Sequence, residues 1–165
     1  MRVWSCSTAL RSGLPVRQRR AHRLAGEIGL TLVHRTDASP GWMALEDAAS
    51  PGGLSRVRGL SVAEIVDRAE AGDETAVAEF GRICELLAVA IVNCHVTLDL
   101  EKVLLTGGMT RAGRPLLQAI QAAFVRLCPP AFVGNLTIEL AGLGEWAGAM
   151  GAAALWLEER PQGSA

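Results

Sequence analysis

The sequence predicts an α/β fold in which a short sheet is covered by helices. From residue 60 onward the expected elements follow in the order helix, helix, strand, helix, strand, helix. The apolar run at 102–106 ends in the pair Gly107-Gly108, and typical helix-starting and helix-ending residues mark the neighbouring segments. In such a layout the strands are parallel and ligands bind beyond their carboxyl ends, which is where the glycine pair falls.

Before residue 60 the chain shows few regular patterns. Residues 1–20 are expected to be irregular, because Arg, Ser, Gly and Pro recur there without a sustained period. The run LTLVH at 30–34 predicts a strand, and TDASPGWM at 36–43 predicts a loop by its Asp, Ser, Pro and Gly content. ALEDAAS at 44–50 predicts one or two helical turns, ended by PGG at 51–53.

Two helices are expected in the middle of the chain. Ser61 followed by Glu64 is a capping-box pattern, which predicts a helix that stops near Gly72. Asp73 is placed to cap a second, longer helix that ends near residues 95–97. Apolar residues recur along this second helix at steps of three and four: Ala76, Phe80, Ile83, Leu87, Ala90, Ile91 and Cys94.

The remaining elements follow from turn residues and periodicity. Pro115 is suited to the first turn of a helix, LLQAIQAAFVRL, which Pro129 and Pro130 terminate. LTIEL at 136–140 alternates like a strand. GEWAGAMGAAALWLEE at 144–159 predicts a closing helix with an Ala/Gly face, followed by a frayed tail.

Composition favours a cytoplasmic protein. The 165 residues are 50% hydrophobic and carry a formal net charge of −1, which indicates neither a nucleic-acid nor a membrane partner. No stretch reaches the roughly 18 apolar residues of a membrane helix, and the N-terminal residues lack the apolar core of a signal peptide. The basic cluster of Arg17, Arg19, Arg20 and Arg23 is expected to be a solvated surface.

The four cysteines are widely spaced and form no C-x-x-C pair. Cys84 and Cys94 lie in an apolar helical run, so we expect buried free thiols there. That state suits a reducing compartment, although the spacing of Cys6 and Cys128 does not exclude oxidation.

Two constellations are candidates for chemistry. Gly107 and Gly108 allow a backbone with positive φ and close approach to a flat ligand, but a plain turn after a strand has the same sequence. Glu27, between Gly26 and Gly29, and Glu46 carry carboxylates that accept hydrogen bonds from sugar hydroxyls. Periodicity alone favours the interpretation that both are surface glutamates, one beside a turn and one on a helix.

Together these segments resemble the second half of ROK proteins. The segments that carry the resemblance run in order over about residues 20–158: RRAHRLAGEIG, LEDAAS, VAIVNCHVTLDLEKVLLTGGMTRAG and GEWAGAMGAAALWLE. That family comprises bacterial sugar kinases and sugar-responsive repressors with a two-lobed, actin-like ATPase (ribonuclease H-like) fold. The resemblance implies the C-terminal lobe of that fold at 21–158, after a degenerate segment at 1–20 and before a disordered tail at 159–165.

The resemblance also assigns site residues. Glu27 and Glu46 match the family's sugar-binding carboxylates, and Gly107 and Gly108 match its adenosine-side motif. The chain departs from the family pattern at Leu30, where E-x-G-H has its histidine. The family's zinc motif aligns with DASPGWMALE, where Asp37, Ser39 and Ala44 replace cysteines and Met43 replaces a glycine, so we expect no zinc.

No catalytic residue is expected in this chain. The family's D-x-G-x-T phosphate loop and its general-base aspartate do not precede AGEIG. ATP and Mg²⁺ are therefore expected only if the protein is a complete kinase. An apolar surface left by a missing lobe predicts a homo-oligomer.

The sequence is compatible with three functions. The favoured one is a truncated ROK protein, a non-catalytic lobe of transcriptional-regulator type that binds a small sugar as effector. The alternatives are a fragment of an ATP-dependent, glucokinase-like sugar kinase and an association module built on the helix at 74–95. No helix-turn-helix segment precedes the lobe, so nucleic-acid binding by this chain is not expected.

Overall fold

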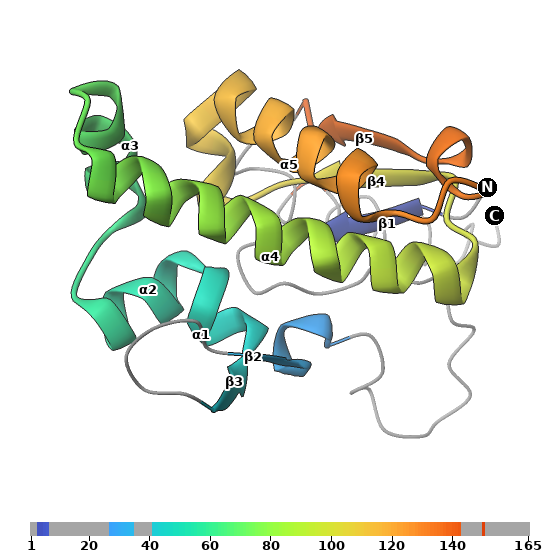
Figure 1. Ribbon diagram of the computed structural model, residues 1–165, viewed down its shortest axis with the longest axis horizontal. Coiled ribbons are helices and arrows are strands. Elements are labelled where there is room, and N and C mark those ends of the chain that lie inside the picture. The colour runs from blue at the N-terminus through green and yellow to red at the C-terminus, as the bar shows by residue number, and fades with distance from the viewer. Residues whose placement is uncertain (1–2, 7–26, 35–40, 143–149, 151–165) are drawn as a thin grey trace, which may run out of the picture.

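The computed structural model describes residues 3–6, 27–34, 41–142 and 150, and shows a small sheet and several helices around one long helix (Figure 1). The long helix is α4 (Glu74–Leu98). On one side of it lie α5 (Gly113–Leu127) and a three-stranded sheet in the order β1 (Val3–Cys6), β4 (Lys102–Leu105), β5 (Thr137–Leu140). On the other side lie α1 (Leu45–Ala49), α2 (Pro51–Arg58) and the antiparallel pair β2 (Leu32–His34) and β3 (Trp42–Ala44).

The short connecting elements complete the architecture. η1 (Ile28–Leu30) precedes β2, α3 (Val62–Glu70) precedes α4, η2 (Gly108–Ala112) joins β4 to α5, and η3 (Val133–Asn135) precedes β5. The closing helix expected at 144–159 lies outside the described residues except for Met150, and so does the tail at 159–165. None of the helices in the described ranges is long and apolar enough to cross a bilayer.

The sheet is parallel throughout, as the sequence predicts for β4 and β5. β4 is the central strand, with Lys102 opposite Thr137 and Leu105 opposite Leu140. One face is apolar, because Val103, Leu105 and Ile138 are buried there. On the alternate positions, Lys102 and Glu139 form a cross-strand ion pair at 3.1 Å.

The expectation of an irregular segment at 1–20 is wrong at Val3–Cys6. These residues form β1, which pairs in parallel with β4 from Val3 opposite Lys102 to Cys6 opposite Leu105. A strand of four residues has too little alternation to be recognised locally, and its hydrogen bonds come from a strand about a hundred residues away. Residues 7–20 lie outside the described residues.

The helix α2 is a second correction, since PGG at 51–53 was expected to end a helix and instead begins one. Ser50 is the N-cap, its Oγ accepts a hydrogen bond from the Gly53 N–H at 3.0 Å, and Pro51 occupies the first turn. α1 and α2 pack closely here: a Cβ on Gly53 would lie 2.0 Å from the Glu46 carbonyl oxygen. The Pro-Gly-Gly sequence is therefore a helix start that needs a residue without a side chain.

The strand β3 is a third correction, because residues 36–43 were expected to be a loop. Trp42 and Met43 pair with His34 and Val33 of β2. The pairing is completed by a hydrogen bond from the Leu45 N–H to the Thr31 carbonyl oxygen at 2.8 Å. The Gly-Trp-Met sequence contains no alternation of its own, so the partner strand decides its conformation.

The helix starts around α3 and α4 are confirmed. Ser61 Oγ accepts from the Glu64 N–H at 3.1 Å while the Glu64 carboxylate accepts from the Ser61 N–H at 2.8 Å, a complete capping box. Asp73 Oδ1 accepts from the Thr75 and Ala76 N–H groups at 2.9 and 3.2 Å. α4 ends after Leu98, slightly later than predicted, at Asp99 in the left-handed region (φ 52°).

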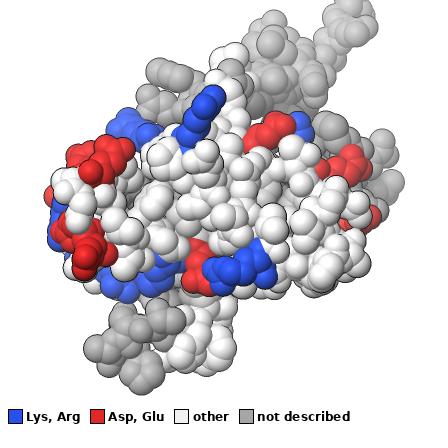
Figure 2. All heavy atoms as spheres, turned by 45° about the horizontal axis from the view of Figure 1, so that its top comes forward, with Lys and Arg blue, Asp and Glu red and all other residues white. Residues whose placement is uncertain are grey.

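The core forms where α4 meets its neighbours on both sides. The residues of α4 that are almost fully buried are Ile83, Cys84, Leu87, Ala88, Ile91 and His95. Leu116, Ile120 and Phe124 of α5 and the buried residues of α1 and α2, including Leu45 and Leu54, belong to the same cluster. Charged side chains of both signs are intermingled around the molecule on the face that Figure 2 shows, with a broad uncharged area between them.

We expect Gly53→Ala to lower the free energy of unfolding by about 3 kcal/mol, because the new methyl group collides with backbone atoms of Glu46 and Asp47. Gly52→Ala is the matched control in the same helix, since a Cβ there has no neighbour within 4 Å. That control is expected to raise stability by up to about 1 kcal/mol through helix propensity. Equal effects of the two substitutions in urea unfolding would contradict the close packing of α1 and α2.

The Asp73 cap predicts a loss of stability in acid. The Arg68 guanidinium and the backbone N–H of Ala76 hold the pKa of Asp73 below its ordinary value. A lowered folded-state pKa contributes stability above the ordinary pKa of about 4, and that contribution disappears as the pH falls through the folded-state value. The wild type should therefore melt a few degrees above Asp73→Asn at pH 7, and this difference in melting temperature should vanish near pH 2.

The control for that experiment is Ser50→Ala, which removes a cap that does not titrate. Its melting-temperature loss is expected to be the same at both pH values. A pH-independent difference for Asp73→Asn would show that the carboxylate charge does not stabilise the start of α4.

Candidate ligand-binding groove

A groove of about 730 Å³ lies between the β2–β3 hairpin and the C-terminal half of α4. One wall comes from η1, β2 and β3 and the other from successive turns of α4; the residues that line it are Glu27, Ile28, Thr31, Leu32, Val33, His34, Trp42, Leu45, Leu86, Val89, Ala90, Asn93, Cys94, Thr97 and Leu98. Its volume is within the range of about 300–1,000 Å³ that is usual for small-molecule sites.

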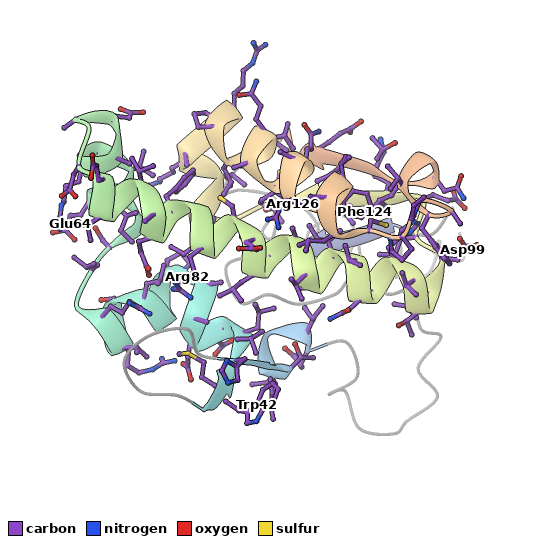
Figure 3. All side chains as sticks on the ribbon, viewed as in Figure 1. Trp42, Glu64, Arg82, Asp99, Phe124 and Arg126 are labelled. Carbon is purple, nitrogen blue, oxygen red and sulfur yellow. The ribbon has the colours of Figure 1, made fainter. Side chains whose placement is uncertain are left out.

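The walls are largely apolar. Leu32 and Trp42 are 67% and 68% exposed, unusually high values for side chains of this size. Trp42 lies at the outer end of the hairpin, below α4 in Figure 3. His34 contacts it edge to face, with ring centroids 5.4 Å apart, and this contact positions the indole at the mouth of the groove.

A few polar groups interrupt the apolar walls. Glu27 is the only carboxylate among the described lining residues, and no Lys or Arg is among them. Asn93 and Thr97 lie one helical turn apart on α4, and the Thr97 hydroxyl donates to the Asn93 carbonyl oxygen at 2.7 Å. The Asn93 side-chain amide is exposed at the groove. The site is therefore apolar with one anionic group and one amide.

The structure does not bring the two candidate carboxylates into one cavity. Glu27 is the residue before η1 and lines the groove. Glu46 is in the first turn of α1, is half-buried, and is absent from the groove wall, although its neighbour Leu45 lines it. The two glutamates thus lie on adjacent elements that pack against each other, with only Glu27 directed at the groove.

The glycine corner lies elsewhere, between β4 and α5. Gly107 has φ of 90°, a conformation that residues with a Cβ rarely adopt, and the Thr110 hydroxyl donates to its carbonyl oxygen at 2.6 Å. Gly108 faces Pro51 of α2, whose Cγ would be 3.7 Å from a Cβ placed there. Neither glycine lines the groove, so the corner and the groove are separate features.

The cysteine thiols of α4 have raised pKa values. Cys84 and Cys94 are free, and burial raises the pKa of Cys84 to about 12 and that of Cys94 to about 11. Cys128 is also free and buried. The prediction of buried thiols is confirmed for Cys84, whereas Cys94 is only partly buried because it lines the groove.

His95 is a core residue. It is fully buried, its Nε2 is 3.0 Å from the Phe132 carbonyl oxygen, and its ring packs edge to face against Phe132. No hydrogen-bond partner for its Nδ1 is found within the described ranges. The histidine ties the end of α4 to the segment before β5.

The structure describes only part of the segment that aligns with the family's zinc motif. Met43 and Ala44 belong to β3, while Asp37 and Ser39 lie outside the described residues. Within the part of the chain that the structure describes, no three His, Cys, Asp or Glu side chains are placed to hold a metal ion.

The groove residues were largely missed by sequence reasoning. Only Glu27 was nominated. Trp42, Asn93 and Thr97 belong to two segments about fifty residues apart, and only the folded hairpin places them together. The one signal in the sequence that could have indicated this site was a Trp beside a Gly in a loop-like segment.

The fold defines the class of the protein as an α/β lobe of the actin-like type. A ROK glucokinase from Streptomyces griseus, solved with glucose and AMPPNP, matches with a TM-score of 0.73 and 22% identity over 93% of this chain and 59% of its own. A ROK family transcriptional regulator, a homologue of the E. coli MLC protein, matches with a TM-score of 0.62 and 20% identity over 84% of this chain and 40% of its own.

The chain belongs to the ROK family, whose profile matches residues 25–159. It is similar to the glucokinase of Halalkalibacterium halodurans, with 30% identity over 105 residues, and to that of Thermotoga maritima, with 32% identity over 96 residues. These alignments cover 64% and 58% of this chain but only 31% and 30% of the two glucokinases. The aligned part thus spans about a third of each relative's length.

The raised pKa of Cys94 predicts slow alkylation. In a Cys6→Ser background at pH 8, iodoacetamide should label Cys94 slowly, and the rate should rise about tenfold per pH unit up to pH 10, because only the thiolate reacts. Mass spectrometry of Cys94→Ser identifies the labelled site, and Cys84 and Cys128 should react only after unfolding. A rate that levels off by pH 9 would contradict burial as the controlling factor.

Proposed function

We propose that this chain is a sugar-effector lobe, which binds a small sugar through Glu27 at the groove, with Glu46 on the adjacent helix α1, and does not phosphorylate it. The observation that supports it best is the position of Glu27. The glutamate of the AGEIG motif, which matches the family's sugar-binding carboxylate, lies at the wall of a groove large enough for a small molecule. Ionised carboxylates suit sugar recognition because each oxygen accepts more than one hydrogen bond.

The non-catalytic part of this proposal rests on the residues present. Phosphoryl transfer requires Mg²⁺, a phosphate clamp and a group that orients the attacking hydroxyl. The 165 residues contain no D-x-G-x-T sequence, and Leu30 stands where the family pattern has a histidine. Leu30 is 64% exposed and offers no hydrogen bond to a sugar.

A glucokinase-like function is the second candidate, and the two glucokinase relatives favour it. In that case the chain supplies one lobe, and Gly107 and Gly108 contact the adenosine of ATP. The positive φ of Gly107 keeps the backbone open for such an approach. ATP and Mg²⁺ belong only to this candidate.

Association through α4 is less well supported. The large apolar residues Ile83, Leu87 and Ile91 of α4 are already buried in the core that α4 forms with α1, α3 and α5. The exposed Leu30, Leu32 and Trp42 of the hairpin region offer a better surface for a homo-oligomer than the helix does.

We expect glucose, mannose or N-acetylglucosamine at 10 mM to raise the melting temperature of the protein by a few degrees, following mass action. Glu27→Gln should weaken binding at least fivefold, because a neutral amide accepts weaker hydrogen bonds than a carboxylate. Glu46→Gln should have a smaller effect, because Glu46 is absent from the groove wall. Glu70→Gln, at the exposed end of α3, is the matched control and should bind as the wild type does.

Two results would count against the effector proposal. Steady ADP release with ATP, Mg²⁺ and any of the three sugars would favour the kinase candidate. The absence of a thermal shift with every sugar, and with the same sugars as methyl glycosides, would contradict sugar binding itself.

A further inference from the structure

We propose that the groove accommodates the apolar aglycone of a glycoside, so that the preferred ligand is a sugar with an aryl or short alkyl substituent. This inference rests on the proposed function, because it places the sugar ring at Glu27. The substituent then extends along Leu32 and Trp42 and against the α4 wall of the groove. Sugar binding at Glu27 does not by itself require a ligand with a substituent that reaches these residues.

The combination of a single carboxylate with extensive apolar surface among the described lining residues carries the inference. Glu27 is the only charged carboxylate among the described lining residues, whereas Leu32, Trp42, Leu86 and Val89 present aliphatic or aromatic surface. A free hexose has hydroxyl groups on nearly all sides and leaves these apolar walls in contact with water. A glycoside with an apolar aglycone can contact both the Glu27 carboxylate and the apolar lining residues, since its hydroxyl groups and its aglycone are at opposite ends.

The exposure of the hairpin points in the same direction. Leu32 and Trp42 are both about two-thirds exposed and lie on paired strands, with His34 fixing the indole by an edge contact. Contiguous apolar surface of this kind commonly marks a binding site. An aromatic ring placed on the indole gains a stacking interaction beyond the burial of its area.

The size and charge of the groove narrow the class of ligand further. Its volume of about 730 Å³ exceeds what one pyranose ring fills and is adequate for a ring with a substituent. No Lys or Arg is among the described residues that line the groove, so an anionic ligand finds no cation there to offset the loss of its hydration. A sugar phosphate should therefore bind more weakly than the uncharged glycoside.

Isothermal titration calorimetry with matched glycosides tests this inference. The probes are methyl and phenyl β-glycosides of glucose and N-acetylglucosamine, α-glycosides of mannose, glucose 6-phosphate, and benzyl alcohol as an aromatic compound without a sugar. For at least one sugar, the phenyl glycoside should bind about tenfold more tightly than the methyl glycoside. Trp42→Ala should remove most of that gain while leaving the methyl glycoside within twofold.

Trp42→Ala replaces an exposed side chain, so the fold is expected to persist, and circular dichroism verifies it. The matched control is Val57→Ala, an exposed apolar residue of α2 outside the groove, which should keep the full preference for the phenyl glycoside. If Trp42→Ala unfolds the protein, Leu32→Ser provides the same test on the neighbouring strand.

Each outcome decides between distinct explanations. Equal affinities for methyl and phenyl glycosides overturn the aglycone inference and leave sugar binding intact. Binding of benzyl alcohol as tight as that of the phenyl glycoside also overturns it, because the groove then takes aromatic compounds without a sugar. Failure of every glycoside to bind overturns the proposed function together with the inference.

Discussion

The arrangement of the molecule depends on one constraint, which is that the long helix α4 must bury apolar residues on two opposite sides. Ala88 and Ala90 are both buried, and a separation of two residues places them on nearly opposite sides of the helix, so a single neighbouring helix cannot cover both. α5 and the sheet cover one side and α1 covers part of the other (Figure 1). A helix with such wide apolar coverage is stable only when both layers are in place. The two layers therefore form one core rather than two.

Polar contacts fix the positions of these layers relative to α4. Arg82 of α4 donates to the Ala48 carbonyl oxygen of α1 at 3.1 Å and pairs with Glu79 at 2.8 Å. On the opposite side Arg126 of α5 pairs with Glu85 at 2.8 Å. Figure 3 shows Arg82 directed toward the lower layer and Arg126 emerging beside α5. Because Arg82 is largely shielded from solvent, its contacts with α1 are stronger candidates for stabilisation than the exposed Arg126 pair.

The groove is a consequence of the same arrangement. α1 is short and covers α4 only near its middle, so the last turns of α4 face the β2–β3 hairpin across open space. The helix provides a rigid wall with Asn93 and Thr97 one turn apart, and the hairpin provides Trp42. A site between a rigid helix and a small hairpin is suited to binding a ligand without further chemistry. The family relationship is consistent with that role, since the family includes regulators as well as kinases.

Local signals in the sequence predicted the structure well where the interactions are local. The Ser61–Glu64 capping box and the Asp73 cap each involve residues within three positions of each other, and both form as expected. β1 and β3 were missed because their conformations depend on partner strands, and α2 was missed because Pro-Gly-Gly was taken as a helix end. Glu27, which the motif resemblance singled out, lines the groove, but the rest of the wall comes from residues that only the tertiary structure brings together.

The central claim is that ligand recognition occurs in the groove between α4 and the hairpin. The most direct test is an NMR titration of ¹⁵N-labelled protein with a phenyl glycoside, in which Trp42→Phe assigns the Trp42 indole signal among the four tryptophans. We expect the Trp42 indole N–H and the Asn93 side-chain amide to shift together with a single dissociation constant. The Gly107 and Gly108 amides should remain unchanged. Shifts confined to those glycines, or no shifts at saturating glycoside, would contradict the assignment of the groove as the binding site.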